Sequence, residues 1–178
     1  MAASTLISVP RDSWAALLEH LLQNDVEQVA VLFASYDRNN GAALSLDAID
    51  YTVCGPEDFT IQSDVHVSLT DEAQARLIKM AWDRRAAFIE LHSHVGNPAT
   101  IRFSPSDLSG FQEFVPHVRW RLRGSPYAAI VVAEGGFDAL VWRGDSSEAT
   151  ALTALRVGRD KLMPSNQTIQ RLRTSTWR

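Results

Sequence analysis

The order of hydrophobic and polar residues divides the first half of the chain into one helix followed by strands. Apolar residues recur at helical spacing over 11–23, which predicts a helix. A nearly continuous apolar run over 26–34 predicts a central strand covered on both faces, and Glu27 is the single carboxylate within it. Residues 43–53 predict another strand, whose apolar phase shifts near 47–48 and indicates a β-bulge.

The second half of the chain continues this alternation. Thr70 followed by two acidic residues predicts a helix that continues to about Arg85. An apolar run over 86–91 predicts a strand, and Ser104-Pro105 predicts the start of the next helix. The other expected elements are a polar turn at 37–41, short strands at 59–61 and 65–69, a hairpin of strands at 127–133 and 137–142, and a last helix over about 147–161. The whole pattern predicts one α/β domain with a mixed sheet.

Composition places the chain among ordinary globular domains. It has 178 residues, of which 46% are hydrophobic and 21% charged, and this length suffices for one domain with a full core. Its single cysteine, Cys54, excludes a disulfide framework and a cysteine-based zinc knuckle. The first residues do not resemble a signal peptide, and no apolar run is long enough to span a bilayer. We therefore expect a cytoplasmic protein with no membrane partner.

The C-terminal part of the chain is basic although the whole protein is acidic. Residues 151–178 contain six Lys and Arg residues against Asp160, whereas the net charge of the chain is −4. A basic segment could contact nucleic acid, but Trp177 is its only aromatic residue, so it lacks the stacking side chains of a nucleic-acid platform. We expect a domain over 1–150, followed at 151–178 by a C-terminal helix and a solvated basic tail, and no nucleic-acid partner.

The residues with the clearest chemistry are His92-Ser93-His94, followed by Ser104 and Asp107. Two histidines separated by one residue on a strand project to the same side of a sheet. Asp107 comes thirteen residues after His94 and could return to supply a third ligand. Two imidazoles and a carboxylate form the ligand set of a catalytic zinc, with the fourth position left for water. Taken alone, Ser104 and Asp107 could be only a helix cap and a carboxylate that complements the helix dipole.

Zinc-dependent hydrolysis also requires a base for the attacking water. The sequence contains no H-E-x-x-H motif, so the base cannot come from that helical arrangement. Glu27 is the best candidate, because a carboxylate in a buried strand otherwise has no reason to be there. Glu90 is the second candidate, although it is more simply explained as a strand residue with a partner. The histidines at 20, 66 and 117 are expected to be structural.

These residues together resemble the JAMM (MPN-plus) family of zinc metalloproteases. That family has a glutamate on an early strand, then H-[S/T]-H and S-x-x-D, and the order of elements is similar over about 5–145. The resemblance implies an MPN-like α+β domain with a curved, mixed sheet flanked by helices. It also implies that His92, His94 and Asp107 bind Zn2+, that Glu27 is the general base, and that Ser104 stabilises the oxyanion.

Two departures from the family pattern concern the segment after the second histidine. Nine residues, Val95 to Phe103, separate His94 from Ser104, where seven are commonest, and Val95 replaces a frequent proline. We expect this longer loop to alter contacts with the substrate more than metal binding. Together with residues 59–69, it could form the walls of a groove for an extended peptide.

The resemblance implies cleavage of a peptide or isopeptide bond after the C-terminal tail of a ubiquitin-like protein. The short chain is similar to stand-alone bacterial members, which accompany ubiquitin-like conjugation and antiviral defence systems, so the expected partner is a ubiquitin-like protein or its conjugates. Three alternatives are a peptidase that processes a sulfur-carrier protein, a RadC-like DNA-associated protein, and a non-catalytic MPN scaffold. The RadC alternative is weakened because the chain contains no recognisable helix-hairpin-helix segment.

Overall fold

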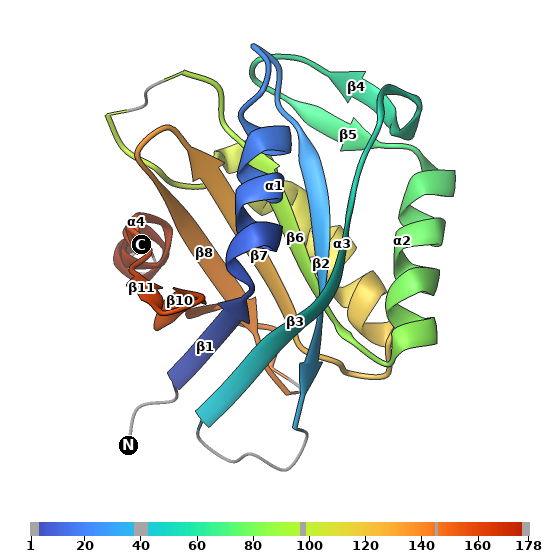
Figure 1. The fold of residues 1–178 in the computed structure, drawn as a ribbon, viewed down its shortest axis with the longest axis vertical. Coiled ribbons are helices and arrows are strands. Elements are labelled where there is room, and N and C mark those ends of the chain that lie inside the picture. The colour runs from blue at the N-terminus through green and yellow to red at the C-terminus, as the bar shows by residue number, and fades with distance from the viewer. Residues whose placement is uncertain (1–3, 38–42, 97–98, 145, 176–178) are drawn as a thin grey trace.

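The structure, a computed structural model, is organised around one mixed, curved β-sheet (Figure 1). It describes residues 4–37, 43–96, 99–144 and 146–175. In these residues the elements are β1 (Ser4–Val9), α1 (Arg11–Leu21), β2 (Val29–Tyr36), β3 (Ala43–Val53), a 3-10 turn (Pro56–Asp58), β4 (Phe59–Gln62), β5 (Val67–Leu69), α2 (Asp71–Arg84), β6 (Ala87–Ser93), α3 (Pro105–Arg121), β7 (Tyr127–Ala133), β8 (Gly136–Trp142), β9 (Thr150–Ala151), β10 (Ala154–Val157), β11 (Asp160–Leu162) and α4 (Gln167–Ser175).

Strand order places β6 in the interior of the sheet. In the described part of the chain nine strands form the order β11-β10-β1-β3-β2-β6-β7-β8-β9, and β4 and β5 form a separate hairpin. The pairs β1–β3, β1–β10 and β6–β7 are parallel, and the other pairs are antiparallel. Because β6 has a strand on each side and helices over both faces, its sequence is almost entirely apolar until the histidines.

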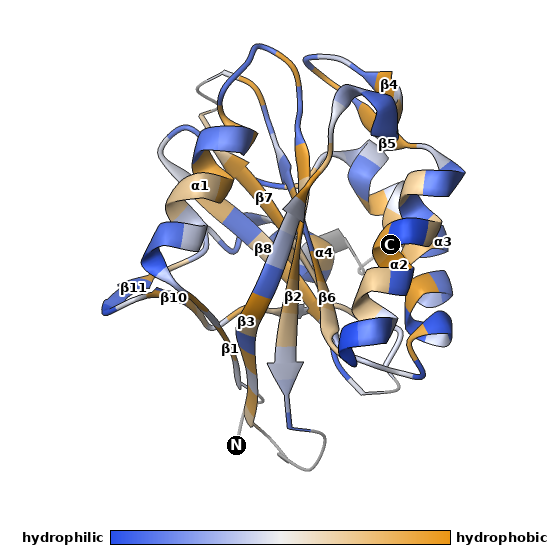
Figure 2. Ribbon diagram, turned by 45° about the vertical axis from the view of Figure 1, so that its right-hand side comes forward, coloured by the Kyte–Doolittle hydropathy of each residue, from blue (hydrophilic) through white to orange (hydrophobic). Residues whose placement is uncertain are grey.

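Helices cover the two faces of the sheet unequally. Trp14 and Leu17 of α1 pack on one face, whereas Phe111 and Val115 of α3 pack with α2 on the other face, around Phe88. Figure 2 shows the hydrophobic colouring gathered on the central strands and the hydrophilic colouring on the outer turns of the helices. No helix in the described ranges combines the length and the apolar character that a membrane crossing requires. The result is the single domain of the α+β type that the sequence predicts.

Most of the expected helices and strands are present within two or three residues of their predicted bounds. The predicted β-bulge is also present. In the β2–β3 pair, Phe33 is opposite Asp50 and Ala34 is opposite Ala48, so Ile49 is the extra residue. The bulge therefore lies one residue beyond the predicted position. Of the predicted turn at 37–41, residues 38–41 lie outside the described residues.

The prediction of a helix over 147–161 is wrong. This segment forms β9, β10 and β11, and β10 extends the sheet by pairing in parallel with β1, from Leu6–Ala154 to Val9–Val157. The spacing of Leu152 and Leu155 is compatible with a helix, but pairing with β1 decides the conformation. The strand β1 itself was not expected. The helix expected in the C-terminal segment is α4, which begins at Gln167, after the last strand β11.

The C-terminal segment contacts the loop that precedes α3. The carboxylate of Asp138 is fully buried and accepts hydrogen bonds from the backbone N–H groups of Asn166 (3.0 Å) and Thr168 (2.9 Å), which fixes the start of α4. The Thr168 hydroxyl in turn accepts a hydrogen bond from the N–H of Phe103 (3.0 Å). Part of the segment expected as a solvated tail therefore supports the end of the nine-residue loop.

Candidate metal centre

The end of β6 presents two imidazoles on one side and ties the strand to the segment before β2. His92 and His94 flank Ser93, whose buried hydroxyl accepts a hydrogen bond from the N–H of Gln28 (2.9 Å). The N–H of Ser93 donates to the carbonyl of Gln28 (3.0 Å). These two bonds hold Glu27, the neighbour of Gln28, beside the histidines.

The first turn of α3 holds the third side chain of the site. The Ser104 hydroxyl accepts from the N–H of Asp107 (3.1 Å), and Oδ2 of Asp107 accepts from the N–H of Ser104 (2.7 Å), which is a reciprocal capping box. Pro105 occupies the first helical position, where its missing N–H has no cost. The capping role of Ser104 and Asp107 is therefore present, and it also fixes the direction of the carboxylate.

His92, His94 and Asp107 converge on one point. Nε2 of His94 lies 3.2 Å from Oδ2 of Asp107, and Nε2 of His92 lies 3.5 Å from the same oxygen. One ligand atom from each residue lies within 4.8 Å of the others. Two ligands bound tetrahedrally at about 2.1 Å from a zinc ion are roughly 3.4 Å apart, so the spacing is compatible with a shared ion.

The hydrogen bonding of His92 supports this interpretation. Its side chain is only 4% exposed, and in the described residues its Nε2 atom forms no hydrogen bond, since Oδ2 of Asp107 lies at the ion-pair distance of 3.5 Å. An unsatisfied buried nitrogen costs about 1–3 kcal/mol, and a bound cation would satisfy it. Two imidazoles with one carboxylate suit a transition metal better than Mg²⁺ or Ca²⁺, which prefer oxygen ligands. The structure therefore contains a His–His–Asp group that could bind a metal ion.

The charges of the group are strongly coupled. Burial would raise the pKa of Asp107, but the two imidazoles and the Ser104 N–H outweigh burial and hold that pKa well below its ordinary value. Burial would lower the pKa of His92, but the neighbouring carboxylates, Asp107 first, raise it. The cluster without a metal ion is thus an ion-pair network that favours a charged imidazole beside an ionised carboxylate.

Glu27 lies next to this cluster, just before β2 rather than inside the strand. Its Oε1 atom is 3.8 Å from Nε2 of His94, and its side chain is 5% exposed. The Glu27 N–H donates to the carbonyl of Ser63 (2.7 Å), and its carbonyl accepts from the side-chain amide of Gln62 (3.0 Å). Burial raises the pKa of the carboxyl, and the opposing effect of His92 and His94 is smaller.

Glu90 has the partner that the sequence could not identify. The Tyr127 hydroxyl donates a hydrogen bond to Oε2 of Glu90, while Oε1 of Glu90 lies 3.9 Å from Nδ1 of His92. Burial raises the pKa of both Glu90 and Tyr127. Nothing in the sequence singles out Tyr127. It lies on β7, and only the parallel pairing of β7 with β6 brings its side chain near Glu90.

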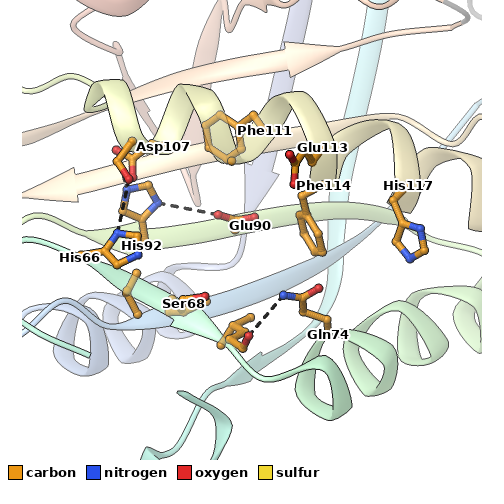
Figure 3. Close-up of a pocket in the computed structure, with 15 residues that line it drawn as sticks. His66, Ser68, Gln74, Glu90, His92, Asp107, Phe111, Glu113, Phe114 and His117 are labelled. Carbon is orange, nitrogen blue, oxygen red and sulfur yellow. Dashed lines mark hydrogen bonds and ion pairs between the residues drawn. The ribbon is translucent and has the colours of Figure 1, made fainter. Parts of the chain in front are cut away.

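Two hollows border the cluster. A cavity of about 410 Å³ extends from Asp107 and His92 along α3, and Figure 3 shows Glu90, Phe114 and Gln74 around it. A second hollow, of about 430 Å³, is lined by His94 and the end of α1. His66 and His117, for which the sequence indicated only structural roles, line the first cavity. The remaining histidine, His20, contacts the carbonyl of Val29 through Nε2 (3.1 Å) and lines neither hollow.

Comparison with known proteins does not identify a family. No family model and no curated protein matches the chain. Among solved structures, the solution structure of protein DSY2949 from Desulfitobacterium hafniense is similar, with 19% identity and a TM-score of 0.47, over 85% of this chain and 93% of that chain. A similarity of this size carries no argument about function. The fold and the site thus define a single mixed α+β domain with a candidate His–His–Asp metal centre.

Proposed function

We propose that this protein is a zinc-dependent peptidase or isopeptidase of the JAMM type. The observation that carries the proposal is the position of the Glu27 carboxylate, 3.8 Å from Nε2 of His94 and beside a His–His–Asp group. Metal ligands with an adjacent buried carboxylate are the components that hydrolysis of an amide bond requires. A scaffold that only binds has no need for this buried carboxylate.

In this proposal His92, His94 and Asp107 hold the zinc ion. Zinc supplies Lewis acidity, which makes water a nucleophile near neutral pH. Glu27 accepts the proton of the attacking water and delivers it to the leaving amine. Ser104 donates a hydrogen bond from its hydroxyl group to the oxyanion, and its capping bond is compatible with this role because there its oxygen only accepts.

The proposed substrate is the C-terminal tail of a ubiquitin-like protein, joined to a target or to its own precursor extension. An extended chain that crosses the cluster would have a hollow on each side of the scissile bond, bordered by His92 and by His94. Cleavage of a sulfur-carrier precursor would use the same arrangement. We place the reaction in the cytoplasm of a bacterium, in a ubiquitin-like conjugation or antiviral defence system.

The test compares the zinc-loaded wild-type protein with Glu27→Gln on fusions of ubiquitin-like proteins to a reporter. Hydrolysis should fall about 10²- to 10⁴-fold in the variant because the base is lost. Zinc content should be unchanged, because Glu27 is not one of the three proposed ligands. Glu19→Gln, which changes an exposed carboxylate of α1 that lines neither hollow, is the matched control. Equal rates for wild type and Glu27→Gln, or no cleavage of any fusion, would contradict the proposal.

A further inference from the structure

A group of exposed arginines and tryptophans lies at the C-terminal ends of α2 and α3, far from the metal centre. It consists of Trp82, Arg85, Trp120, Arg121 and Arg123, which we term the Arg–Trp patch. The Arg123 guanidinium lies 4.9 Å from the centre of the Trp82 ring, and the Arg121 guanidinium lies 5.8 Å from the centre of the Trp120 ring. Trp82 is 46% exposed and Trp120 is 74% exposed, so both leave aromatic surface available to a partner.

The arginines of the patch carry uncompensated charge. In the described part of the chain, Arg85, Arg121 and Arg123 form no ion pair with an acidic residue. Two nearby acids already have partners, since Asp83 pairs with Lys79 and Asp50 pairs with Arg84, and Asp71 lines the same hollow as Arg121. The patch is therefore locally positive in a chain of net charge −4. Arginine and tryptophan are also the residues that most often dominate protein–protein binding energies.

A continuous track connects this patch with the metal centre. The cavity beside His92 extends along α3 to Gln74 and His117, as Figure 3 shows. Gln74 and His117 also line the next hollow, between α2 and α3, and Arg121 is among the residues that line it. From Asp107 to Arg121 the helix rises about 21 Å, at 1.5 Å per residue. An extended polypeptide covers this length with about six residues.

We propose that the Arg–Trp patch binds an acidic segment of the protein substrate, about six residues from the scissile bond. The proposal rests on the peptidase function and specifies one feature of its substrate. A polypeptide suits the track better than a nucleic acid, because Glu113 and Asp71 line the hollows between the metal centre and the patch and would repel a phosphate backbone. The acidic segment would contact Arg121 and Arg123, and its apolar side chains would pack on the exposed indoles.

The experiment measures binding without hydrolysis, using the zinc-loaded full chain with Glu27→Gln. The probe is a fluorescein-labelled peptide in which a Gly-Ser spacer of about six residues separates the scissile bond from a Glu-Glu-Phe cluster. Its counterpart carries Lys-Lys-Phe instead. Fluorescence anisotropy should show tighter binding of the acidic peptide, and adding Arg121→Glu with Arg123→Glu should weaken it by about tenfold or more, because like charges then face each other.

The matched control reverses the same number of charges elsewhere. Arg156→Glu with Lys161→Glu changes exposed residues of β10 and β11 and should leave the binding of the acidic peptide unchanged. Equal binding of the acidic and basic peptides, or equal loss in patch and control variants, would overturn the proposal. Tighter binding of single-stranded oligothymidylate, lost in the patch variant alone, would also overturn it and would identify a nucleic-acid interface.

A kinetic arm separates this proposal from the function on which it rests. In wild-type protein, a reporter fusion with the acidic cluster should have a lower KM than one without it, and the patch variant should remove the difference with kcat unchanged. Cleavage of both fusions with equal KM refutes the patch proposal and leaves the peptidase function intact. Peptide binding at the patch by a protein that cleaves no fusion refutes the peptidase function alone.

Discussion

The carboxylate of Glu90 lies 3.9 Å from Nδ1 of His92, while the carboxylate of Asp107 faces Nε2 of the same ring at 3.5 Å. The imidazole therefore lies between two carboxylates. The Tyr127 hydroxyl, bonded to the other oxygen of Glu90, restricts how that carboxylate can turn. We therefore expect Glu90 and Tyr127 to act as positioning residues, which favour the orientation in which His92 presents Nε2 to a metal ion.

Glu90→Gln and Tyr127→Phe should each weaken zinc binding about 10- to 100-fold, because both changes loosen the orientation of the His92 ring. Competition with a chromogenic chelator measures the affinity. Glu113→Gln is the control, since Glu113 lines the same cavity without contacting a proposed ligand. Unchanged zinc affinity in Glu90→Gln would show that Glu90 does not orient the ligand.

Zinc affinity should fall as the pH is lowered, beginning above the pH at which an ordinary histidine titrates, about 6.5. The reason is that the neighbouring carboxylates raise the pKa of His92 despite its burial, and a proton must leave the ring before zinc can bind. Titration calorimetry between about pH 5 and pH 8 checks the sign. A constant affinity down to pH 6 would contradict it.

The thiol of Cys54 should be almost unreactive in the folded protein. Its side chain is buried, and burial together with the nearby Asp58 raises its pKa to about 12, so hardly any thiolate is present near neutral pH. Iodoacetamide labelling followed by mass spectrometry should show no modification until denaturant unfolds the chain. Labelling at the rate of a free thiol would mean that Cys54 is accessible.

Asp138→Ala should destabilise the protein by about 3 kcal/mol, because it leaves buried backbone N–H groups at Ala139, Asn166 and Thr168 without their acceptor. Urea unfolding measures the loss. The control is Asp160→Ala, which removes an exposed ion pair with Arg11 and should cost less than about 1 kcal/mol. Hydrogen exchange over 99–103 should accelerate only in Asp138→Ala, since α4 supports that segment.

Local patterns predict the interior of this fold better than its edge. The strand β1 carries a signal, because Thr5, Ile7 and Val9 alternate as buried residues, but the run is too short to predict a strand by itself. Its partner β10 has no such signal, because only pairing with a strand from the other end of the chain makes Leu155 part of the sheet. Pairings between distant segments are not encoded in local periodicity.

The candidate metal ligands could be predicted because their geometry is local. His92 and His94 share a strand face, and Asp107 follows within one loop. Glu27 could be inferred only because burial makes a lone carboxylate costly. Tyr127 and the Arg–Trp patch could not be inferred, because they depend on which strands and helices lie side by side.

Both ends of the nine-residue loop are fixed independently of its middle. At one end the N–H of His94 donates to the carbonyl of Val132 (2.8 Å), and at the other the N–H of Phe103 donates to Thr168. Ile101 is a further fixed point, because its carbonyl accepts a hydrogen bond from the Ser165 hydroxyl (2.6 Å), so we expect substitutions elsewhere between the two anchors to leave His94 and Asp107 in place. Under the proposed function, changes in this loop would alter which protein is cleaved, while the residues that carry the chemistry stay the same.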